Sequence, residues 1–188
     1  MKFVQNLTAL LLVAALPFQM TAQKWFTRDA KVQFDATAPN SPENIKASSN
    51  SGTFVLDQSS NRLEASVLVK GFQFEKALMQ EHFNENYMES SKYPKATFRG
   101  KIDDPSKVTF GKDGTYTATV SGDLTMHGVT KAVSVPATFT VKQDKIGVSA
   151  NFATVLKDYS IDVPSLVADK VAKEAKIKIE GNLAKLNN

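Results

Sequence analysis

Few residues in this sequence have the types and spacing that catalysis or metal binding requires. The two histidines, His82 and His127, each lack a His, Asp or Glu at the following i+2 or i+4 position, a spacing that metal sites commonly use. Cysteine is absent, which excludes disulfides, thiolate metal ligands and a cysteine nucleophile. There is no Gly-x-Ser-x-Gly elbow and no glycine-rich phosphate loop, and no two carboxylates can be placed across a cleft. The residues therefore nominate no enzyme, metal site or other cofactor, and solvated or backbone-bonded histidines are the simpler interpretation.

The composition is that of one globular domain. The chain has 188 residues, of which 42% are hydrophobic and 22% are charged, enough apolar material for a single core. The formal net charge is +4, but only three of the 23 basic residues are arginine and none forms a basic cluster with aromatic residues. This pattern argues against nucleic-acid binding.

The first 22 residues differ from the rest of the chain. Lys2 precedes an apolar run over residues 7–18, and a small residue follows at Ala22. This order predicts a signal peptide over residues 1–22 that is cleaved after Ala22, which leaves one exported domain over residues 23–188 in the periplasm or outside the cell. No later stretch approaches the ~20 apolar residues of a transmembrane helix.

Apolar residues recur at every second position through most of the remaining sequence, as in strands with one buried face. The clearest case is 115–124, where Tyr116, Ala118 and Val120 alternate with threonines. Seven further segments follow the same rule: 32–36, 54–56, 63–74, 96–102, 133–141, 146–152 and 177–183. Within 63–74 the apolar residues change parity, which predicts a bulge near Lys70. Eight strands with short turns indicate an all-β antiparallel barrel or sandwich.

Two segments interrupt this pattern. In residues 75–91, Met79, Phe83 and Tyr87 are spaced i, i+4, i+8, which predicts a short amphipathic helix. Residues 157–173 combine polar residues with a proline and a possible helical turn. We expect both segments to act as lids or connections over one end of a barrel.

The interior parity mixes large aromatic residues with very small ones. This mixture fits a lumen that its own side chains leave partly empty, and it fits equally a packed core in which small residues accommodate aromatic rings. The residues expected to contact a ligand in the lumen or under the lid are Phe34, Met79, Phe83, Tyr87, Phe98, Tyr116, Ala118, Val120, Phe139 and Phe152.

Two motifs carry a resemblance to a known family. Residues 79–100 contain a His-Phe…Tyr-Pro…Phe pattern, and residues 122–131 read Gly-Asp-Leu-Thr-Met-His-Gly-Val-Thr-Lys. Both are similar to segments of the YceI-like proteins, secreted bacterial lipocalin-like barrels regarded as polyisoprenoid- or lipid-binding. The sequence departs from that family at residues 29–31, where many members have a His-Ser pair, and at residues 157–159, where many have an arginine.

The resemblance implies an eight-stranded antiparallel lipocalin-like barrel that binds an isoprenoid or other long-chain lipid in its lumen. The sequence leaves open whether the protein is a monomer or a homodimer. The alternative is a packed structural or stress-response barrel that interacts with other envelope components. A third hypothesis is an enzyme acting near His82. A lumen of several hundred cubic ångströms would favour the carrier over the packed barrel.

Overall fold

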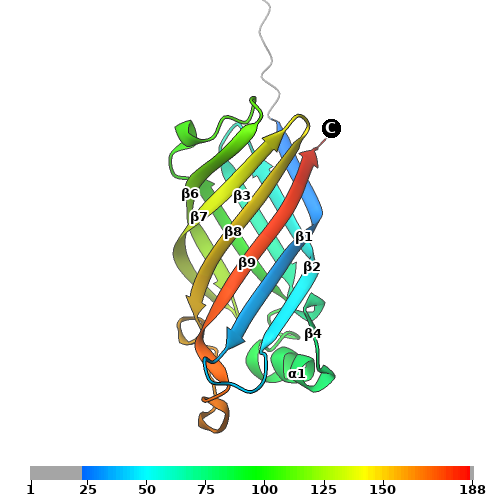
Figure 1. Cartoon of the computed structure of the whole chain (residues 1–188), viewed down its shortest axis with the longest axis vertical. Coiled ribbons are helices and arrows are strands. Elements are labelled where there is room, and N and C mark those ends of the chain that lie inside the picture. The colour runs from blue at the N-terminus through cyan, green and yellow to red at the C-terminus, as the bar shows by residue number, and fades with distance from the viewer. Residues whose placement is uncertain (1–22, 187–188) are drawn as a thin grey trace, which may run out of the picture.

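A computed structural model of the chain describes residues 23–186, and these residues form one antiparallel β-barrel (Figure 1). Its strands are β1 (Lys24–Thr37), β2 (Lys46–Asp57), β3 (Arg62–Leu68), β4 (Gln73–Phe74), β5 (Lys95–Ile102), β6 (Gly114–Met126), β7 (Val129–Lys142), β8 (Lys145–Val155) and β9 (Val171–Lys185). Helical segments are α1 (Ala77–His82), a π-helical turn (Phe83–Tyr87) and 3-10 turns at Val69–Gly71, Pro105–Lys107, Leu156–Tyr159 and Ser165–Val167. The prediction of an all-β barrel with a short helix is confirmed.

Eight strands close the barrel, and β4 is an additional short strand. The hydrogen-bonded order is β1-β9-β8-β7-β6-β5-β3-β2-β4, and β1 also pairs with β2, which closes the ring. All pairs are antiparallel, and β4 pairs only with the beginning of β2, at Ala47 and Ser48. The strand that closes the barrel, β1, has register shifts against both neighbours, between Thr27 and Ala30 on the β2 side.

A two-residue turn joins β6 to β7. Met126 pairs with Val129, and the intervening His127 and Gly128 have φ angles of 51° and 75°. Positive φ at both central positions is the geometry of a type I′ turn, which matches the right-handed twist of paired strands. A Cβ on residue 128 would also lie 2.5 Å from Tyr93 Cε1, so two independent constraints require glycine there.

The segment predicted as one bulged strand, 63–74, has a different structure. β3 ends at Leu68, a 3-10 turn over Val69–Gly71 follows, and β4 then pairs with β2. The prediction of a bulge was therefore wrong. The change of parity in the sequence reflects a break between two strands.

The end of the barrel that holds both termini of the described chain is tightly packed. Here Leu56, Phe139, Ile146 and Leu183 have no more than 1% of their surface exposed. Val108 and Phe110, from the connection between β5 and β6, belong to the same cluster, and the Phe110 and Phe139 rings meet edge to face at 6.1 Å. Because the connection contributes apolar side chains to the interior, this end has no open lumen.

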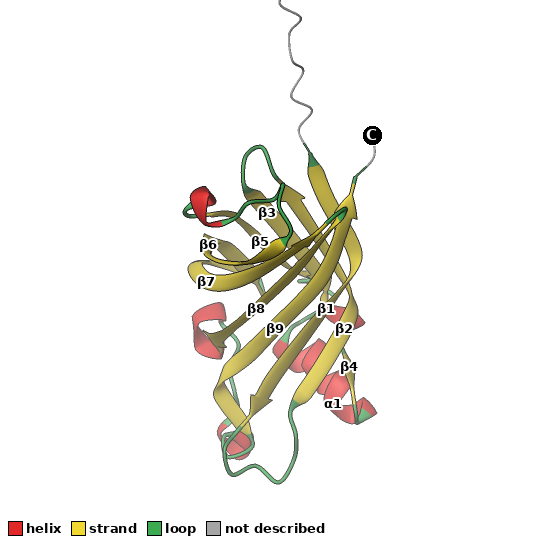
Figure 2. Cartoon of the chain, turned by 45° about the horizontal axis from the view of Figure 1, so that its top comes forward, coloured by secondary structure: helices red, strands yellow, loops and turns green. Residues whose placement is uncertain are grey.

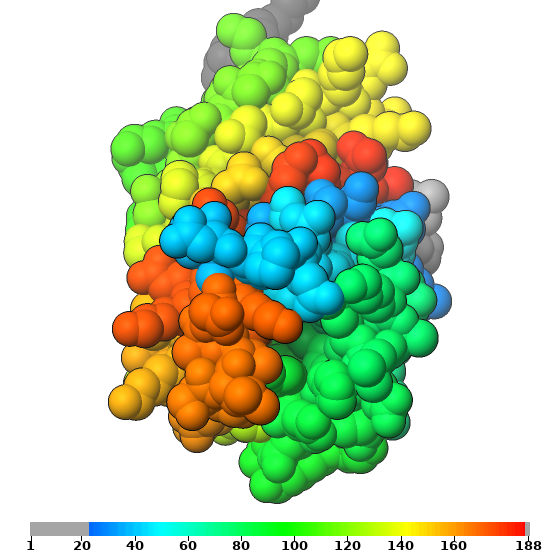
Figure 3. All heavy atoms as spheres, turned by 60° about the horizontal axis from the view of Figure 1, so that its bottom comes forward, coloured from blue at the N-terminus to red at the C-terminus, as the bar shows by residue number. Residues whose placement is uncertain are grey.

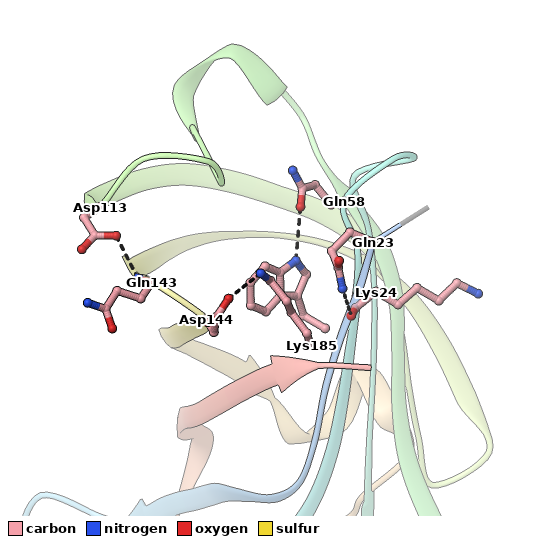
Figure 4. A network of polar contacts seen from close by, with 8 residues as sticks. Gln23, Lys24, Gln58, Asp113, Gln143, Asp144 and Lys185 are labelled. Carbon is pink, nitrogen blue, oxygen red and sulfur yellow. Dashed lines mark hydrogen bonds and ion pairs between the residues drawn. The ribbon is translucent and has the colours of Figure 1, made fainter. Parts of the chain in front are cut away.

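Polar contacts cover the packed end (Figure 4). The buried Trp25 donates a hydrogen bond from Nε1 to Gln58 Oε1 at 3.3 Å, and the Lys185 ammonium lies over its indole ring. Lys185 also pairs with Asp144 of the β7–β8 hairpin. These contacts tie β1, the β2–β3 turn and β9 together where the barrel closes.

The opposite end carries the irregular segments. Figures 1 and 2 show α1, the β1–β2 connection and the connection from β8 to β9 gathered there. Figure 3 shows the same three segments around this end in a space-filling view. No helix within residues 23–186 has the length and apolar character needed to cross a membrane.

Candidate functional site

A cavity of about 310 Å³ occupies the half of the barrel beneath α1 and the two connections. Its lining is predominantly apolar and comes from the barrel strands, from α1 with the π-helical turn, and from residues on both connections. The floor is formed by Phe54, Ala65, Phe98 and Ile179, which also contact the packed half. The barrel is therefore solid at one end and hollow at the other.

The floor depends on one glycine. A Cβ on Gly100 would lie 2.5 Å from Phe98 Cζ, closer than real Cβ contacts allow. The Phe98 ring therefore lies over a position where only glycine leaves room for it. In this part of the interior, a small residue accommodates an aromatic side chain and does not create empty space.

Six of the ten residues expected to contact a ligand line this cavity: Phe34, Met79, Phe83, Tyr87, Phe98 and Phe152. They come from β1, from the lid formed by α1 and the π-helical turn, from β5 and from β8, so residues far apart in sequence meet at one site. Met79, Phe83 and Tyr87, which the sequence places at helical spacing, all line the cavity.

The structure does not bring the other four expected residues to the cavity. Ala118, Val120 and Phe139 belong to the packed cluster, and Tyr116 packs against it while its hydroxyl donates a hydrogen bond to the Lys112 carbonyl at 2.9 Å. All four have the inward parity that the sequence predicts. They lie nearer the packed end, and parity gives the face of a strand without giving the depth along the barrel.

Four phenylalanines fix the lid to the barrel wall. Phe83 stacks on Phe34 at 5.2 Å between ring centroids and meets Phe74 at 5.0 Å and Phe72 at 5.8 Å. Offset or edge-on aromatic pairs at such distances add stability beyond the area that they bury. Phe83 is thus both an anchor of the lid and part of the cavity wall.

Sequence reasoning missed several lining residues: Phe72, Phe74, Met88, Leu124, Met126 and Ile161. Phe72 and Phe74 share the parity of the second half of 63–74 and were available from that signal. Met88 could not be predicted from helical spacing, because its backbone N–H donates to the Phe83 carbonyl, five residues earlier, in the π-helical turn. A wider turn brings Met88 under the lid, where an α-helical spacing would not place it.

The mouth of the cavity carries its ionisable groups. Among the described lining residues, the only carboxylate, amine and imidazole side chains are those of Glu43, Lys170 and His82. Glu43 on the β1–β2 connection accepts a hydrogen bond at 2.8 Å from Lys76, which directly precedes α1. This bond with Lys76 holds the pKa of Glu43 below its usual value and raises the pKa of Lys76. The ion pair links two segments that border the mouth.

One inward-facing hydroxyl has no partner. Thr154 is 5% exposed, lines the cavity from the end of β8, and its Oγ1 makes no hydrogen bond within the described part of the chain. An unpaired buried hydroxyl costs stability, so such groups are uncommon in folded proteins. Thr154 lies opposite Ala175 of β9, the strand that begins directly after Lys170.

His127 has a structural environment. Its Nδ1 donates to the Tyr159 carbonyl at 3.0 Å, its Nε2 lies 3.4 Å from Glu89 Oε2, and the Tyr93 ring meets it edge to face. The histidine thereby connects the β6–β7 turn to the segment after β8. Within residues 23–186, no group of three His, Cys, Asp or Glu side chains is arranged to hold a metal ion.

Comparison with known proteins gives one matching family. The model of the YceI-like domain matches residues 19–183, which is most of the chain. Among curated proteins, a UPF0312 protein of Pseudomonas putida (strain GB-1) is 33% identical over 102 residues, which cover 51% of this chain and 48% of that protein. The chain thus spans about half the length of the curated relatives it matches.

Solved structures share the fold at low sequence identity. A polyisoprenoid-binding domain from Saccharophagus degradans, implicated in plant cell wall breakdown, has a TM-score of 0.75 and 11% identity, over 88% of this chain and 100% of that domain. BcnA of Burkholderia cenocepacia has a TM-score of 0.65 and 17% identity, over 82% and 96% of the two chains. The YceI protein of Campylobacter jejuni has a TM-score of 0.60 and 19% identity, over 78% and 87%.

Proposed function

This chain belongs to the YceI-like domain family, and from that premise we propose that it binds the apolar chain of an isoprenoid or other long-chain lipid in the barrel cavity. The observation that carries the proposal is the apolar cavity of about 310 Å³ beneath the lid. This volume lies at the lower end of the range for small-molecule sites. The fold shared with a polyisoprenoid-binding domain supports the same class of ligand.

The cavity volume limits how much of a lipid it encloses. A methylene group takes up about as much space as a water molecule, roughly 30 Å³ in the liquid, so the cavity holds about ten chain carbons. Burying ten methylenes contributes about 8 kcal/mol before the cost of immobilising the ligand. Since micromolar affinity corresponds to 8.2 kcal/mol, the enclosed chain alone gives binding weaker than micromolar, and tighter binding would need contributions from groups at the mouth.

The proposed setting is outside the cytoplasm. It rests on the predicted signal peptide, which lies outside the described residues. An exported carrier of this kind would shield an apolar chain from water between membranes or enzymes.

The packed structural barrel is the second candidate, and the packed cluster around Phe139 supports it for one half of the molecule. A structural barrel gives no role to the cavity in the other half. An empty apolar cavity sacrifices dispersion contacts and stability, which a purely structural barrel has no reason to do.

Extraction and mass spectrometry test the proposal. Protein purified from its native host is denatured in organic solvent, and the extract is compared with that of an Ala96→Trp variant prepared identically. Ala96 lines the cavity, so the variant controls for lipid carried on the outer surface. We expect a lipid that is enriched in the wild-type extract. Extracts of both proteins that contain the same lipids, in the same amounts, would contradict the proposal.

A further inference from the structure

The ionisable groups at the cavity mouth are not equivalent. Glu43 is paired with Lys76, whereas Lys170 has no carboxylate oxygen within 4.0 Å of its Nζ among residues 23–186. Lys170 is half-buried and lines a predominantly apolar cavity. A cation in that position loses part of its hydration, and the Glu43 carboxylate, whose pKa it helps to lower through space, forms its direct ion pair with Lys76 and not with Lys170.

A second unsatisfied group lies on the same wall. Thr154 faces the interior at the end of β8, opposite Ala175, and its hydroxyl makes no hydrogen bond. Lys170 directly precedes β9 and lies five residues before Ala175, so along the strand Thr154 is roughly 16 Å deeper in the barrel than Lys170. An acceptor oxygen of a ligand at the mouth would satisfy the ammonium, whereas the hydroxyl lies beside the part of the cavity that holds the chain.

We propose that the cavity selects a single-chain amphiphile with an anionic head group, which Lys170 holds at the mouth while about ten carbons of the chain lie in the cavity. This inference rests on the proposed function and narrows its ligand class. The tail points inward because the floor at Phe98 is apolar and the ionisable groups are at the mouth. A carboxylate and a phosphate share the required chemistry, a charged oxygen that accepts hydrogen bonds from an ammonium.

Glu43 should have the opposite effect on the affinity for an anionic ligand. Its carboxylate lies near the same head group, repels it and holds Lys76 in an ion pair. Removal of this charge would free Lys76 and lower the repulsion. The proposal therefore requires that loss of Lys170 and loss of Glu43 change the affinity for an anion in opposite directions.

The experiment uses three ligands with the same chain: decanoate, decyl phosphate and decan-1-ol. The affinity for each ligand is measured at pH 8 by its displacement of the neutral fluorescent probe N-phenyl-1-naphthylamine from the full-length mature protein. We expect wild type to bind at least one of the two anions more tightly than the alcohol. The tighter anion identifies the head group as carboxylate or phosphate.

Three variants then separate the charges. Lys170→Gln should weaken binding of the preferred anion about fivefold without changing that of decanol, as expected for a partly exposed charge-assisted hydrogen bond. Glu43→Gln should strengthen the same anion and leave decanol unchanged. Lys173→Gln is the matched control, because Lys173 is exposed, lies three residues away and does not line the cavity.

The outcomes distinguish the two proposals. If decanol, decanoate and decyl phosphate all fail to displace the probe from wild type, the proposed function itself is overturned. If decanol binds but neither anion binds more tightly, or if Lys173→Gln weakens the anion as much as Lys170→Gln does, only the head-group inference is overturned. Opposite effects at Lys170 and Glu43, with decanol constant, would support it.

Discussion

The division of the barrel into two halves is tested by one substitution made at two places. Ala96 and Ala118 lie on neighbouring strands, β5 and β6, and both face the interior. Ala96 lines the cavity, whereas Ala118 is 3% exposed within the packed cluster. Replacement of either by tryptophan introduces the same indole, once into empty space and once among close-packed side chains.

The expected magnitudes follow from these surroundings. At Ala118 the indole has no room, so overpacking should lower the free energy of unfolding by at least 1–3 kcal/mol, the range roughly typical of extra core atoms. At Ala96 the indole enters the cavity, so the loss should stay below about 1 kcal/mol. Displacement of only two ligand methylenes costs about 1.6 kcal/mol, so Ala96→Trp should weaken binding by more than tenfold.

Urea unfolding gives the stability of each variant, and displacement of a neutral probe by decan-1-ol gives the affinity. The two variants should exchange roles: Ala96→Trp loses affinity and keeps its stability, and Ala118→Trp loses stability and keeps its affinity in the absence of urea. If both variants lose the same free energy of unfolding, the half of the barrel that holds the cavity is packed in solution. If Ala118→Trp loses affinity as a folded protein, the cavity extends further than the structure shows. Either result would refute the reasoning.

Three further predictions concern the lid, a turn and the amino terminus. Phe83→Ala should cost about 2–4 kcal/mol in urea unfolding and also weaken ligand binding, because the ring anchors the lid and lines the cavity, while Leu78→Ala, at a side chain 62% exposed, should change neither. Unchanged affinity would make the lid purely structural. Gly128→Ala should lower the free energy of unfolding by about 1–3 kcal/mol because φ is 75°, whereas Gly147→Ala, whose added Cβ has no neighbour closer than 3.5 Å, should have little effect; equal losses would argue against strain at the turn. Amino-terminal sequencing of protein from its native host should begin at Gln23, and an uncleaved chain would contradict export.

The alternation of apolar residues was sufficient to predict the eight barrel strands, although it joined β4 to β3, but it did not predict the extent of the cavity. Ala118 and Ala96 have the same inward parity and the same size, yet one is packed and the other borders empty space. The difference arises from Val108 and Phe110, which enter the barrel from a connection. A connection has no periodicity, so the sequence does not indicate that its side chains fill the interior.

The lid illustrates the same limit at a smaller scale. Helical spacing correctly grouped Met79, Phe83 and Tyr87 on one face, because only short-range geometry was needed. The charged residues of the mouth, Glu43 and Lys170, lie outside helices and strands. Their approach to the cavity depends on how the connections fold over the barrel end, which no local pattern specifies.

The closing strand has a consequence for how the chain folds. β1 forms hydrogen bonds with β2, its neighbour in sequence, and with β9, the last strand, so that Trp25 pairs with Lys185. Contacts of such long sequence separation form only after a large loss of chain entropy, and folds that depend on them form slowly. During synthesis, the cavity wall therefore stays incomplete until β9 is available, with the edges of β1 and β8 unpaired and open to association with other chains. Ligand capture is thus a property of the finished chain, and a protein truncated before β9 would aggregate before it could bind.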